Sequence, residues 1–95
     1  MNIKQIQKEI HNKLSQNPLL SPAIGLCNYL LKTFSEEDWK EYEQETGNKR
    51  IIISQPKNGF EALIDEATGF DKVQSINLGK FLLWNINEFE KGLNE

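Results

Sequence analysis

The sequence predicts an α+β protein in which three N-terminal helices pack on an antiparallel meander of three or four strands, followed by a short C-terminal helix. The first half repeats apolar residues at helical spacing behind N-cap signals. The second half contains a β-branched run at 50–54 and an apolar run at 80–86, both of strand length. Helices that cover one face of an antiparallel sheet bury the apolar sides of both the helices and the sheet. A chain of 95 residues fits a single domain, 1–95.

The first two helices are predicted from the spacing of their apolar residues. Residues 2–15 carry one narrow apolar stripe, and Pro18 ends this helix because proline disfavours helical geometry in the residue before it. Ser21 and Pro22 are good residues to begin a second helix, over 22–34. Its polar positions form only a thin strip, so we expect it to be the central, most buried helix.

A third helix is predicted over residues 36–46. Ser35 and Asp38 have the spacing of a capping box, and Gly47 is a natural residue for the position just past the helix end. After it, residues 50–54 give the strongest strand signal in the chain.

Residues 60–68 leave two alternatives. Their apolar residues fit a strand, with 65–69 as a hairpin loop and 70–76 as the return strand, or a short helix that ends at Gly69. We favour the hairpin, because a short helix between two turns would be marginal. Residues 80–86 are then a further strand, and Asn87 begins the last short helix.

Few residues suited to catalysis or metal binding are present. His11 is the only histidine and lies on the polar side of the first helix, whereas Cys27, the only cysteine, lies among apolar residues of the second. One cysteine and one histidine cannot form a structural zinc site. The sequence predicts no enzyme, no metal and no cofactor. Four glycines fall at expected element boundaries rather than in a phosphate-binding loop: Gly47, Gly59, Gly69 and Gly79.

The expected location is the cytoplasm. No apolar run approaches the roughly 20 residues that span a bilayer, and the first residues lack the apolar stretch of a signal peptide. A single cysteine fits a reducing compartment. The strong preference for Lys over Arg indicates an AT-rich genome, bacterial or phage.

The third helix is strongly acidic. Residues 36–46 carry a net charge of −5, whereas the whole chain carries −3, so the remainder is slightly basic. Trp39 and Tyr42 share one face of this helix, which we expect to pack on the core. The opposite side then carries the candidate partner-binding residues: Glu37, Asp38, Glu41 and Glu45.

The leading functional hypothesis is a small non-catalytic protein of the inhibitor, immunity or accessory type, which binds a basic protein through this acidic face. Immunity proteins against nuclease toxins and phage-encoded inhibitors are similar in size and charge, which is an analogy only. The alternative is a regulatory nucleic-acid-binding module that uses lysines of the first helix with Lys49 and Arg50, although the negative net charge argues against it. A third hypothesis is an enzyme with His11 as its acid–base group and a site completed by a second subunit. A homodimer formed at the sheet edge is compatible with all three.

Overall fold

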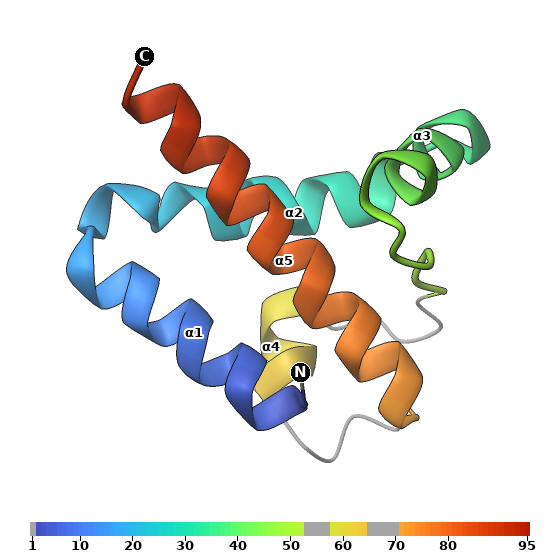
Figure 1. The fold of residues 1–95 in the computed structure, drawn as a ribbon, viewed down its shortest axis with the longest axis horizontal. Coiled ribbons are helices and arrows are strands. Elements are labelled where there is room, and N and C mark those ends of the chain that lie inside the picture. Colours follow the sequence, from blue (N-terminus) through green and yellow to red (C-terminus); the bar gives the residue numbers. More distant parts are fainter. Residues whose placement is uncertain (1, 53–57, 65–70) are drawn as a thin grey trace.

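The chain folds as a helical protein, so the expected α+β fold is wrong. The computed structural model describes residues 2–52, 58–64 and 71–95, of which 82% lie in helices and none in a strand. Figure 1 shows α5 running across the molecule, with α1 beside it and α3 at one corner. The elements are α1 (Ile3–Gln16), the 3₁₀ turn η1 (Pro18–Leu20), α2 (Pro22–Thr33), α3 (Glu36–Thr46), α4 (Gly59–Ile64) and α5 (Lys72–Leu93).

The central helix is α5, and the expectation that residues 22–34 form it is wrong. Helices α1, α2 and α4 all pack on α5. By contrast, α2 buries fully only Ala23 and Cys27, and it leaves Leu26 and Tyr29 at 41% and 63% exposure. The residues of α5 that are buried are Asn77, Leu78, Gly79, Phe81, Leu82, Leu83, Asn85 and Ile86.

Two expected strands and the expected last helix are parts of this one long helix. Residues 72–76 and 80–86 lie within α5, and Asn87 lies inside α5 instead of beginning a new helix. A helix buried on most sides has the same continuous apolar run as a buried strand, so periodicity alone does not separate them. Asp71 is the residue that caps α5, and its carboxylate accepts the Gln74 N–H at 2.7 Å.

Gly79 lies in the middle of α5 and not at an element boundary, and α1 packs closely against α5 there. A Cβ atom at this position would overlap Cγ2 of Ile6 and lie 3.2 Å from its Cδ1. Ile6 is completely buried. Glycine therefore lets two backbones approach more closely than any other residue would allow.

The helix alternative for residues 60–68 is correct over Gly59–Ile64, and the favoured hairpin is wrong. Helix α4 is short, but distant residues satisfy its ends. The side-chain oxygen of Asn28 accepts the N–H of Gly59 at 2.8 Å, and the side chain of Gln7 donates to the carbonyl of Leu63. These contacts supply the stability that such a short helix lacks alone.

Other parts of the expected meander receive no support or lie outside the described residues. Ile51 is buried and Ile52 is 68% exposed, and neither is in a strand. The end of the 50–54 segment and the proposed loop at 65–69 are not among the described residues. The described part of the chain therefore has no sheet edge at which the expected homodimer could form.

The first three helices are confirmed with small shifts of their ends. The predicted capping box of α3 is present: the Ser35 hydroxyl accepts the Asp38 N–H at 3.2 Å, and the Asp38 carboxylate accepts the Ser35 N–H at 3.0 Å. Gly47 ends the helix with a φ of 73°, in the left-handed region that favours glycine.

Replacing Gly79 by alanine tests the close packing of α1 on α5. Gly79→Ala should lower the free energy of unfolding by roughly 1–3 kcal/mol, because the added methyl group overlaps Ile6. The control is Gly25→Ala in α2, where the new atom meets open space and helix propensity should add up to about 1 kcal/mol. Urea denaturation measures both. Equal stabilisation by the two substitutions would contradict the close packing of α1 on α5 at Gly79.

Candidate functional site

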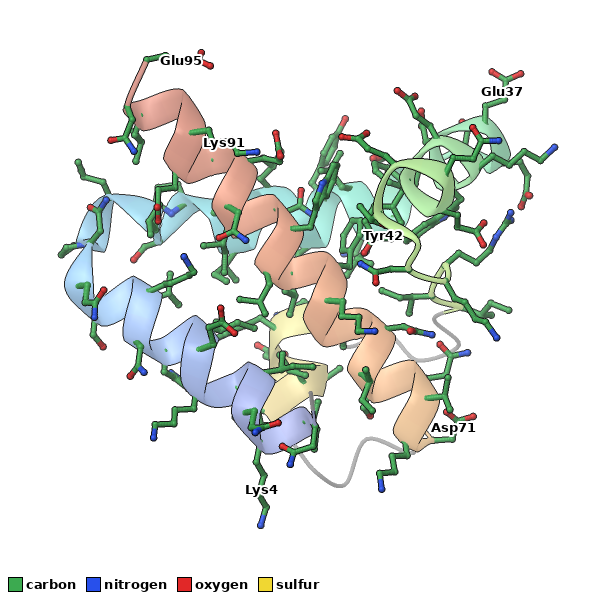
Figure 2. The ribbon with its side chains drawn as sticks, in the orientation of Figure 1. Lys4, Glu37, Tyr42, Asp71, Lys91 and Glu95 are labelled. Atoms are coloured by element: carbon green, nitrogen blue, oxygen red, sulfur yellow. The ribbon has the colours of Figure 1, made fainter. Side chains whose placement is uncertain are left out.

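Helix α3 is held to the body of the protein by aromatic side chains. Trp39 and Tyr42 are 8% and 2% exposed, which confirms that their shared face packs inward. The Tyr42 ring lies edge-on to Phe81 and Trp84 of α5, with centroids 5.3 and 5.2 Å apart. Figure 2 shows Tyr42 between α3 and α5, and Glu37 on the outer side of α3 pointing away from the body.

A single arginine divides the acidic residues of α3 into two groups. Arg50 lies 2.5 Å from the Glu36 carboxylate through Nη1 and 3.0 Å from that of Glu43 through Nη2. The hydrogen bond to Glu36 raises the pKa of Arg50, and the same bond lowers the pKa of Glu36. Within the described part of the chain, no Lys or Arg forms an ion pair with the four predicted partner-binding residues, all of which are exposed.

Three of these four residues border one cavity. Asp38, Glu41 and Glu45 line a space of about 160 Å³. Glu37 is not among the lining residues. The other walls are aromatic and come from three elements: Phe34 at the end of α2, Tyr42 of α3 and Trp84 of α5. The site is therefore an acidic rim around aromatic rings, which we call the acidic cavity.

No pattern in the sequence indicates that Phe34 and Trp84 lie beside the acidic helix. Trp84 belongs to the apolar run at 80–86, which the sequence predicts to be a strand, and its separation from α3 along the chain gives no signal that the two meet. The edge-to-face contact of Phe34 with Trp39, at 4.9 Å between centroids, places Phe34 beside the acidic helix. Only the packing of α2, α3 and α5 brings the three rings together.

The structure does not bring His11 and Cys27 into one site. His11 is exposed on α1, where its ring lies 6.1 Å from that of Phe60. Cys27 is completely buried, and its thiol donates to the carbonyl of Leu82 at 3.8 Å. Burial raises the pKa of the Cys27 thiol to about 12, which makes it a poor nucleophile.

The basic residues proposed for nucleic-acid binding are scattered. Arg50 is engaged by Glu36 and Glu43, and Lys13 lies 3.8 Å from Glu90. Lys4 and Lys8 are exposed on α1, and Figure 2 shows Lys4 pointing outward from its first turn.

Metal ligands, membrane-spanning helices and known relatives give no further assignment. No cluster of His, Cys, Asp or Glu within the described ranges could hold a metal ion. No helix formed by these residues is both long and apolar enough to cross a membrane. Comparison of the chain with protein families, curated proteins and solved structures found no match.

The Cys27 thiol should be protected in the native protein. Since its pKa is raised, the folded state favours the neutral thiol, and stability falls as pH rises from the unfolded pKa of about 8.5 towards about 12. Ellman's reagent should therefore label Cys27 only after denaturation. In the variant Cys27→Ala, the free energy of unfolding should decrease less over this alkaline pH range, because the thiol no longer contributes. Rapid labelling of the native protein would contradict the buried position.

Replacing Arg50 tests its ion pair with Glu36. Arg50→Gln should raise the pKa of Glu36, measured by NMR titration of the side-chain carboxyl, because the hydrogen bond that lowers it is lost. The stabilisation from this pair is present above the unfolded pKa of about 4.3 and is lost as pH falls through the lower folded value. Lys40→Gln is the control and should have a smaller effect, since Lys40 acts on Glu36 only through space. An unchanged Glu36 pKa in Arg50→Gln would show that the pair does not form.

Proposed function

We propose that this chain is a small non-catalytic binding protein whose acidic α3 face docks on a basic surface of another protein. The observation that supports this proposal most is that only some acidic residues of α3 form an ion pair. Arg50 neutralises two of them, and the described residues leave Glu37, Asp38, Glu41 and Glu45 without a cationic partner. These four carboxylates concentrate negative charge on one side of α3.

Such a face acts first on the rate of association. Unpaired carboxylates on one surface create a local negative potential that attracts a basic partner and repels an acidic one. A purely solubilising role would not require aromatic side chains beside the charges. The acidic cavity supplies both, which is the reason to assign the face a partner.

The acidic cavity has the size and chemistry for one basic side chain of that partner. An arginine or lysine inserted there would meet aromatic rings of Phe34 and Trp84 and the carboxylates of the rim. A cation beside an aromatic ring gains about 0.5–2 kcal/mol, depending on how fully it is desolvated. Arginine fits best, because its planar guanidinium stacks on rings and pairs with carboxylates at the same time.

The mechanism would be steric or electrostatic blocking of the partner, as in proteins of the inhibitor, immunity or accessory type. We place this function in the cytoplasm, where a buried single thiol such as Cys27 stays reduced. The alternative of direct nucleic-acid binding has less support, since Arg50 and Lys13 are already paired with carboxylates.

Charge reversal of the face provides the test. The partner is first isolated from cells of the native source with the wild-type chain as bait, and the association rate is then measured with both proteins purified. Combining Glu37→Lys, Glu41→Lys and Glu45→Lys should slow association at low salt by at least about tenfold, because the attractive potential is reversed. The matched control combines Glu9→Lys, Glu61→Lys and Glu95→Lys, which changes the net charge equally on other surfaces.

A rate that falls equally in both triple variants would show that net charge, and not the α3 face, governs binding. Unchanged binding in the first variant would show that the site lies elsewhere. The variant Trp84→Leu tests the contribution of the acidic cavity apart from that of the charged α3 face. It should increase the dissociation rate of the complex and leave the association rate and its salt dependence unchanged. Thermal unfolding of this variant checks that the loss of the Tyr42 contact has not unfolded the protein.

A further inference from the structure

We propose a second binding site, a basic cavity between the segment after α3 and the N-terminal half of α5, that takes a small organic oxyanion carrying a phosphate or carboxylate group. The cavity has a volume of about 280 Å³. Its polar wall includes Lys49, Asn77 and Lys80, and its apolar wall includes Val73 and Ile76. We call it the basic cavity.

The charges of this cavity are all of one sign. Lys49 follows α3 and Lys80 belongs to α5, and the fold brings both residues to the wall of one cavity. Neither forms an ion pair with a residue that the structure describes, and no acidic residue of the described ranges lines the cavity. Two lysines at the wall of one cavity make the local potential positive, and a bound anion would be attracted to both.

Asn77 adds an uncharged polar residue to the wall of the basic cavity. It is only 8% exposed, and its side chain forms no hydrogen bond with any described residue. The other buried asparagine, Asn85, donates to the carbonyl of Phe81 at 3.0 Å. Buried polar groups in proteins normally have a partner. Asn77 lines the basic cavity, so an oxygen of a ligand bound there would give its side-chain amide a hydrogen-bond partner.

The three polar groups suit an oxygen-bearing anion. Each ammonium group donates charge-assisted hydrogen bonds, and the asparagine amide donates neutral ones to another oxygen of the same group. Val73 is 59% exposed at this wall, and Ile76 lies one turn further along α5. An anion with a short hydrocarbon part would cover both side chains. The volume of the basic cavity is at the small end for ligand sites, so the ligand must be small.

NMR titration of the full chain with small probes tests the site. The probes are n-butyl phosphate and n-butyrate, each compared with sodium chloride at equal ionic strength. Backbone amide shifts should cluster around Asn48, Lys49, Asn77 and Lys80 for at least one probe. Acetate and inorganic phosphate complete the set, and they should bind more weakly than the corresponding butyl compound because they leave the apolar wall uncovered.

Three lysine variants distinguish specific binding in the basic cavity from nonspecific attraction of anions to surface lysines. Lys80→Gln and Lys49→Gln should each weaken the apparent affinity by about tenfold, as expected for the loss of one charge-assisted hydrogen bond. Lys8→Gln on α1 changes the net charge equally and should leave affinity within about twofold. The spectra also report whether each variant is folded.

Three results would overturn the proposal: no localised shifts with either butyl probe, shifts spread over lysines throughout the surface, or equal weakening by all three substitutions. Localised shifts that either cavity variant abolishes would support it. The basic cavity is distinct from the acidic face, so the triple reversal at Glu37, Glu41 and Glu45 should not abolish these shifts. A failure of one site therefore leaves the other to be judged separately.

Discussion

The burial of α5 is the constraint on which the arrangement of the other helices depends. This helix presents apolar residues on most of its circumference, so it is stable only when neighbours cover it from several directions. Helices α1, α2 and α4 do so directly, and α1 approaches α5 closely at Gly79, against Ile6. The two ends of α4 are in turn completed by side chains of α1 and α2, so even the shortest helix depends on this arrangement.

The same helix sets the position of the acidic surface. Phe81 and Trp84 of α5 receive Tyr42 in edge-to-face contacts, and this fixes which side of α3 faces solvent. Arg50 then removes two carboxylates from the exposed charge by pairing with Glu36 and Glu43. Hydrophobic packing and a local ion-pair network together leave a defined negative face rather than a uniformly acidic helix.

The acidic and basic cavities are close along α5, because Trp84 lines one and Lys80, one helical turn earlier, lines the other. Their walls on the other side come from α3 and from the segment that follows it. Opposite charges are thus displayed at neighbouring places where α3 and α5 meet. A basic side chain and a small anion would be selected there by complementary electrostatics, with aromatic or aliphatic walls adding contact area.

The sequence alone determined the first three helices, the capping box at Ser35, the glycine end at Gly47 and the acidic residues of the candidate site. These features depend on local spacing and hydrogen bonding, which lie within a few residues of each other. Tertiary structure decided the rest. The apolar run at 80–86 became helix because neighbours cover it on several sides, and residues 59–64 because Asn28 and Gln7 complete their hydrogen bonds. Packing also decided which aromatic rings join the carboxylates, since contact between residues so far apart in the chain leaves no local pattern.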